Sequence, residues 1–156
     1  MVGPMKISFD LDDTLVCNLP SELQEKNRVP WFLRSWLRDP LRRGAVDLLG
    51  RLQSLGHEVA IYTTSGRSPR SVRWWLWCYG IRVSQVINRR IHEQAVRQIP
   101  LRNIPTKLPS LFNIDLHVDD LPGVAIEGRR HHFEVLVVDP HDTQWTTRVL
   151  DAVETG

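Results

Sequence analysis

The 156-residue sequence has few of the features that mark secreted, membrane or fibrous proteins. Its only cysteines, Cys17 and Cys78, are too few for a disulfide framework or a cysteine-rich zinc site. No apolar run approaches the roughly 18 residues that a membrane span needs. The first six residues contain no hydrophobic signal core, and no internal repeat is present. We therefore expect a protein of the reducing cytoplasm that has no membrane partner.

An excess of charge of one sign is also missing. The net charge of +2 is too small to imply nucleic-acid binding by itself. Lysine is scarce, since 17 of the 20 basic residues are arginine. Arginine suits phosphate recognition, but a GC-rich genome produces the same bias, so a nucleic-acid partner stays open without support. The hydrophobic fraction of 42% and the length are typical of one globular domain, which we place over residues 1–156.

Short apolar segments alternate with amphipathic ones along the chain. Strands are predicted at residues 6–9, 58–62, 83–87, 114–118 and 135–138. Helices are predicted near residues 44–55, 69–79, 91–98, 123–127 and 143–153. This alternation predicts an α/β fold, a three-layer, doubly wound, Rossmann-like parallel sheet.

Residues 16–40 break this alternation, because three prolines interrupt them. We interpret the segment as a small flap over the functional site. Within it, Trp31, Phe32 and Trp36 have helical spacing and enough apolar surface to hold a short helix against the domain.

Acidic and hydroxyl side chains follow the predicted strands. They are Asp10, Thr63, Asp119 with Asp120, and Asp139. In parallel sheets, ligands bind beyond the carboxyl ends of the strands, where these side chains converge. Carboxylates gathered at one edge repel each other unless a cation lies between them, and hard oxygen ligands favour magnesium. Asp139 precedes a proline and is interpreted as a turn residue.

The motif that follows the first strand, Asp10-Leu11-Asp12-Asp13-Thr14, resembles the first motif of the haloacid dehalogenase superfamily. Three further motifs of that superfamily have counterparts in the right order. These counterparts are Thr63, Lys107 and the pair Asp119-Asp120. The resemblance extends over most of the chain and implies a phosphatase-like hydrolase that uses Mg²⁺.

In this superfamily the first two aspartates carry the chemistry. The resemblance makes Asp10 the nucleophile that forms an aspartyl-phosphate, and a metal ligand. Asp12 is implied to protonate the leaving oxygen, then to activate water, while its backbone carbonyl binds the metal. Mg²⁺ between a carboxylate and a phosphate removes much of their repulsion. The second acid argues against a dehalogenase, which lacks it.

The remaining motif residues bind phosphate or metal in the family. Thr63 is implied to donate to a phosphoryl oxygen, and Lys107 to place positive charge against the transferring group. Replacing Lys107 is expected to lower turnover and leave the fold intact. Asp119 is implied to bind the metal directly, and Asp120 to bind it through water or to orient Lys107.

Neither gap between motifs, from Leu15 to the helix at Gly44 or from Thr64 to Lys107, has room for a cap domain. The sequence thus resembles the capless (C0-type) members, which act on proteins, polynucleotide ends, nucleotides and sugar phosphates. We expect a Mg²⁺-dependent phosphatase of a phosphorylated, large substrate, with Thr64 and Arg67 as substrate-binding residues. The alternatives are a polynucleotide-end phosphatase, a nucleotidase and a non-catalytic binding module.

Two further groups of residues have more than one interpretation. Trp74, Trp75 and Trp77 could stack on bases, but helical spacing is also typical of core residues. The arginines of residues 89–102 could form a phosphate-binding groove, although a solvated helix face accounts for them as well.

Overall fold

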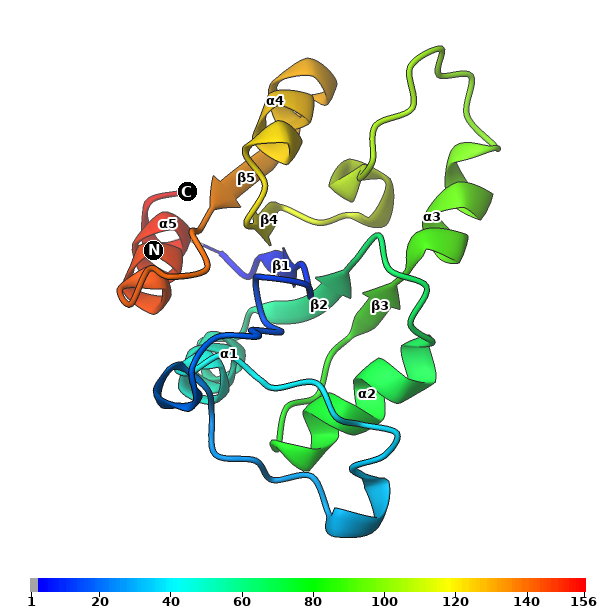
Figure 1. The fold of residues 1–156 in the computed structure, drawn as a ribbon. Helices are drawn as coiled ribbons and strands as arrows, with labels where there is room; N and C mark the ends of the chain where they lie inside the picture. Colours follow the sequence, from blue (N-terminus) through cyan, green and yellow to red (C-terminus); the bar gives the residue numbers. More distant parts are fainter. Residues whose placement is uncertain (1–2) are drawn as a thin grey trace.

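The computed structural model describes residues 3–156 and contains one five-stranded parallel sheet (Figure 1). The strands are β1 (Lys6–Phe9), β2 (Glu58–Tyr62), β3 (Gln85–Ile87), β4 (Leu116–Asp119) and β5 (Glu134–Val137). Their order is β3-β2-β1-β4-β5, so the chain starts at the centre and builds outward in both directions. This confirms the predicted doubly wound α/β sheet. Its switch point lies between β1 and β4, where such folds bind ligands.

Four α-helices of the described residues connect the strands, and a fifth follows the last strand. They are α1 (Ala45–Ser54), α2 (Pro69–Cys78), α3 (Arg89–Val96), α4 (Pro122–His131) and α5 (Trp145–Thr155). Figure 1 shows α1 and α2 on one side of the sheet, with α5 next to α1, and α4 on the other side. The described residues contain no cap domain, and no helix among them is long and apolar enough to span a membrane.

Local signals explain where the helices begin. The Ser68 side chain caps α2 by accepting from the Ser71 N–H at 3.1 Å, and a proline follows at the first helical position. In α3, the Asn88 side chain accepts from the Ile91 N–H at 3.0 Å. This cap starts α3 two residues before the predicted position. The helix predicted at residues 123–127 is longer, since it runs from Pro122 to a left-handed residue at His132.

The central strands are buried on both faces. Ile7 and Phe9 of β1 are fully inaccessible, as are Ile61 of β2 and Val118 of β4. Such strands are near-continuously apolar, which is why the sequence pattern located them. Polar side chains accordingly accumulate where each of these strands ends.

The flap, residues 16–40, differs from its prediction. It contains only 3₁₀ turns, including Trp31–Leu33, and the three aromatic side chains do not hold it. Trp31, Phe32 and Trp36 are 80%, 63% and 51% exposed. The buried anchors are instead Val29 and Leu37, which pack into the main core. A three-residue 3₁₀ turn next to Pro30 is too short to present one continuous apolar face.

Candidate active site

The carboxyl ends of the three central strands place the motif residues together. The Asp10 N–H donates to the Val118 carbonyl at 2.9 Å, which continues the ladder between β1 and β4 by one residue. The Thr63 N–H donates in the same way to the Ile87 carbonyl at 2.9 Å. Because the sheet itself holds these backbones, Asp10, Thr63 and Asp119 occupy rigid positions at one edge.

Three carboxylates converge at the switch point. Asp10, Asp119 and Asp120 each offer one ligand atom, and these atoms lie within 4.8 Å of one another. Asp10 and Asp119 are buried, and Asp120 is half-buried and accepts from the Thr14 hydroxyl at 3.3 Å. Three oxygen ligands around one point fit a hard divalent cation. Among the described residues the Asp12 carboxylate is outside this group.

Lys107 lies between two of these carboxylates. Its Nζ is 2.8 Å from Asp10 Oδ1 and 2.5 Å from Asp119 Oδ2, and its side chain is 2% exposed. Asp10 and Asp119 therefore orient this lysine, the role that the sequence left open for Asp120. An ammonium has three donors, so one remains for a further acceptor.

A hydrogen-bonded pair fixes the segment that carries Lys107. The Leu108 N–H donates to the Tyr62 hydroxyl at 2.8 Å. That hydroxyl is also hydrogen-bonded to Nδ1 of His92 on α3, at 2.6 Å. The segment before β4 is thus tied to β2 and α3, which places the lysine at the sheet edge.

Burial and neighbouring charges separate the pKa values of the two buried aspartates. Burial raises the pKa of Asp10 to about 7, because desolvation outweighs the attraction of Lys107. Burial also acts on Asp119, but hydrogen bonds and charges from His117 and Lys107 hold its pKa well below its usual range. Asp119 is therefore ionised at neutral pH, whereas Asp10 is charged in only part of the molecules.

The sequence motifs did not single out His117, a buried residue that is hydrogen-bonded to Asp119. It pairs in register with Ser8 of β1, and its Nδ1 lies 2.7 Å from the Ser8 hydroxyl. Its Nε2 lies 2.9 Å from Asp119 Oδ2. Complete burial lowers the pKa of His117 to about 4, so the neutral ring donates from Nε2 to the carboxylate. The two-residue spacing from Asp119 in a strand, which puts both on one face, was the available signal.

Asp12 is held by Arg67, a residue predicted to bind substrate. Arg67 Nη1 and Nη2 each lie 2.9 Å from an oxygen of Asp12, which makes a bidentate pair. The same guanidinium reaches Asp39 of the flap, with Nε 3.0 Å from Oδ2. The structure thus links Arg67 to the candidate acid and to the flap at once. Thr64, also predicted to bind substrate, is exposed next to the buried Thr63.

Arg42 is a second residue that the sequence gave no reason to single out. It is 3% exposed, and its guanidinium donates to the carbonyls of Thr14, Asp139 and Asp142 at 3.3, 2.7 and 2.9 Å. It also lies 4.6 Å from the Trp145 ring centroid. These contacts join the loops after β1 and β5. The Asp139 side chain accepts from the His141 N–H at 2.8 Å, which is the turn role expected of it.

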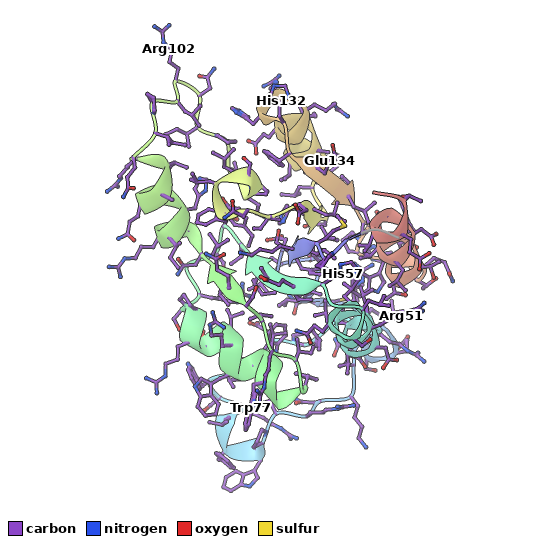
Figure 2. All side chains as sticks on the ribbon, turned by 180° about the vertical axis from the view of Figure 1, so that it is seen from behind. Arg51, His57, Trp77, Arg102, His132 and Glu134 are labelled. Carbon is purple, nitrogen blue, oxygen red and sulfur yellow. The ribbon has the colours of Figure 1, made fainter. Side chains whose placement is uncertain are left out.

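The tryptophans of α2 divide between core and surface. Trp75 is buried and donates from Nε1 to the Asp39 carbonyl at 2.9 Å. Trp74 and Trp77 are 40% and 55% exposed, with ring centroids 5.5 Å apart. Figure 2 labels Trp77 on α2. The arginines of residues 89–102 are exposed, and Figure 2 shows Arg102 projecting from the loop after α3. Their exposure is compatible with a solvated face and with a phosphate-binding groove.

Comparison with known proteins is informative about the fold. No protein-family model matches the sequence, and no curated protein is similar to it at the level of sequence. A chain of the Pnkp1/Rnl/Hen1 RNA repair complex superposes with a TM-score of 0.54 at 17% identity, over 86% of this chain and 42% of that one. A second Pnkp1/Rnl/Hen1 structure gives 0.52 at 16% identity, over 87% and 46%. This chain thus spans less than half the length of either.

A third similar structure matches nearly end to end. A predicted HAD-like family hydrolase from Porphyromonas gingivalis has a TM-score of 0.50 at 13% identity, covering 94% of this chain and 98% of that one. At 13–17% identity, these similarities show a shared α/β, Rossmann-like fold.

Proposed function

We propose that this chain is a Mg²⁺-dependent phosphatase that hydrolyses a phosphate monoester through an aspartyl-phosphate on Asp10. The observation that carries the proposal is the buried Asp10 at the switch point, with Lys107 Nζ 2.8 Å away and two further carboxylates beside it. A nucleophile, a phosphate-binding cation and a set of metal ligands thus meet at one place. The HAD-like fold supports this assignment.

The donor set fits the metal. Asp10, Asp119 and Asp120 would hold Mg²⁺, with the Asp12 backbone carbonyl as a further ligand. The metal would neutralise charge between the carboxylate nucleophile and the phosphate. Three carboxylates against one lysine leave an excess of negative charge, which a divalent cation would balance.

The side chains perform the two chemical steps. An Asp10 oxygen attacks phosphorus, the bond to the leaving oxygen breaks, and Asp12, released from its pair with Arg67 and protonated, gives that oxygen a proton. Asp12 then takes a proton from water, whose oxygen attacks the aspartyl-phosphate and regenerates Asp10. Thr63 and the free donor of Lys107 bind the phosphoryl oxygens, where negative charge is concentrated.

Mg²⁺ should bind about tenfold more tightly at pH 8 than at pH 6. The pKa of Asp10 near 7 means that a proton competes with the metal below that pH and is absent above it. Isothermal titration calorimetry at both pH values checks this, and Asp119→Ala should weaken binding strongly at both. Equal Mg²⁺ affinity at pH 6 and pH 8 would contradict the prediction that buried Asp10 is a metal ligand with a pKa near 7.

The function is tested by measuring phosphate release from p-nitrophenyl phosphate and a panel of phosphate monoesters. Turnover should require Mg²⁺ and disappear in chelator. A non-catalytic binding module would bind phosphate esters without releasing phosphate. Undiminished turnover by metal-stripped protein would rule out the metal-dependent mechanism.

A polynucleotide-end phosphatase is the second candidate. The observation that favours it is a surface cavity of about 440 Å³ whose lining includes Trp74 and Trp77 with Arg73 and Arg82. Exposed aromatic rings next to arginine suit stacked bases and backbone phosphates. The fold similarity to a chain of an RNA repair complex points the same way. Steeply salt-dependent retention of a phosphorylated oligonucleotide would support this candidate, and equal turnover of free nucleotides would count against it.

A further inference from the structure

A second cavity, of about 240 Å³, lies between the flap and α2, directly beside the candidate active site. Its lining includes Trp36, Arg38 and Asp39 of the flap, together with Arg67 and Ser71. Its inner wall includes the buried Leu11 and Trp75. The catalytic roles assigned above do not use this cavity.

The geometry connects this cavity to the leaving-group side of the reaction. Asp10 is buried, whereas the Asp12 side chain is 55% exposed, so a phosphoryl group reaches inward and its alcohol points outward past Asp12. Arg67 donates hydrogen bonds to both carboxylate oxygens of Asp12 at 2.9 Å and to Asp39 at 3.0 Å. Since Arg67 and Asp39 also line the cavity, an alcohol whose oxygen receives the Asp12 proton lies at its entrance.

The lining groups define the chemistry that would fit. The Trp36 indole is 51% exposed and offers a flat apolar face. Arg38 and Arg67 supply donors, Asp39 an acceptor, and Ser71 a hydroxyl. One flat wall with polar groups around it suits a ring with a polar rim. The volume equals that of about eight liquid waters, which is enough for one such ring.

We propose that the cavity between the flap and α2 is the leaving-group subsite, in which Trp36 stacks on a ring of the alcohol. The substrate class is then a phosphate monoester of a ring-bearing alcohol, either a sugar phosphate or a nucleotide. This proposal rests on the phosphatase function proposed above. Trp36 acts here as a specificity-determining residue.

The test compares kcat/KM for three alkyl phosphates: glycerol 3-phosphate, glucose 6-phosphate and adenosine 5′-monophosphate. Stacking contributes roughly 1–3 kcal/mol per ring, so at least one ring substrate should exceed glycerol 3-phosphate by about fivefold or more. A higher kcat/KM for glucose 6-phosphate would indicate a sugar phosphate as the substrate, and a higher kcat/KM for adenosine 5′-monophosphate would indicate a nucleotide. In Trp36→Ala the ratio of kcat/KM between the ring substrate and glycerol 3-phosphate should fall to near one, because KM for the ring substrate rises. Trp36→Phe should retain most of the ratio.

Trp31→Ala is the matched control, since Trp31 is a tryptophan of the same flap that is 80% exposed and outside the cavity lining. It should keep the wild-type preference. The subsite is refuted if wild type shows no ring preference, or if both tryptophan variants lose it equally. Binding of adenosine and glucose, observed by saturation-transfer NMR, gives a readout without turnover. Absence of phosphate release from every ester, p-nitrophenyl phosphate included, would refute the phosphatase function, while ring binding that depends on Trp36 would still support the cavity.

Discussion

Asp10→Asn should abolish phosphate release, with a loss of about 10⁴-fold or more, as is usual when a covalent nucleophile is removed. The amide is a far poorer nucleophile, and it also withdraws one of the three carboxylates that face the metal site. The substitution keeps size and shape, and Lys107 retains Asp119 as its charged partner. Steady-state release of phosphate from p-nitrophenyl phosphate measures the effect, and circular dichroism establishes that the variant is folded.

Asp12→Asn is the control for this prediction, since it changes the neighbouring carboxylate in the same way. Loss of the acid and base should slow turnover by roughly 10²- to 10⁴-fold. It should also let the aspartyl-phosphate persist, which mass spectrometry of the quenched protein would detect. Wild-type rates in Asp10→Asn would show that the reaction does not pass through a covalent intermediate on this residue.

Lys107→Ala should reduce both turnover and stability. Removing the ammonium leaves Asp10 and Asp119 buried without their shared cation, at 6% and 0% exposure. Breaking a buried ion pair by removing one partner costs about 3–5 kcal/mol in free energy of unfolding. The sequence predicted loss of turnover with an intact fold, but the burial of Lys107 changes the expectation for stability. Lys107→Arg should not restore activity, because a planar guanidinium cannot replace a compact ammonium in this space.

Urea unfolding measures the stability of Lys107→Ala, once in chelator and once in Mg²⁺. A bound divalent cation would offset part of the unpaired charge on the two buried carboxylates, so the destabilisation should be smaller in Mg²⁺. Lys26→Ala is the matched control, since Lys26 is exposed in the flap and should unfold like wild type. If Lys107→Ala were as stable as wild type in chelator, the lysine would not be the electrostatic partner of the two carboxylates.

A short set of side-chain contacts connects the flap to the candidate active site. Arg67 joins Asp12 to Asp39, and Trp75 holds the Asp39 carbonyl from α2. Movement of the flap therefore changes the surroundings of the candidate general acid.

The sequence by itself determined the class of fold and the edge of the sheet where the motif residues gather. Apolar strands buried on both faces, and helices with one apolar face, are local patterns that a reader of the sequence can find. In a parallel sheet, the residues that follow the strands must meet at one edge. Asp10, Thr63 and Asp119 could therefore be brought together before any coordinates were known.

Only the tertiary structure decided which partner each side chain has. Arg67 pairs with Asp12 across 55 positions of sequence, and Ser8 with His117 across 109, so no local pattern encodes either contact. Both depend on strand order and on the path of the flap. Side-chain exposure was also decided only by the tertiary structure. The aromatic residues of the flap are of the types usually found in a core, yet they face solvent. Burial is set by the space that neighbouring elements leave, which is a property of the folded chain as a whole.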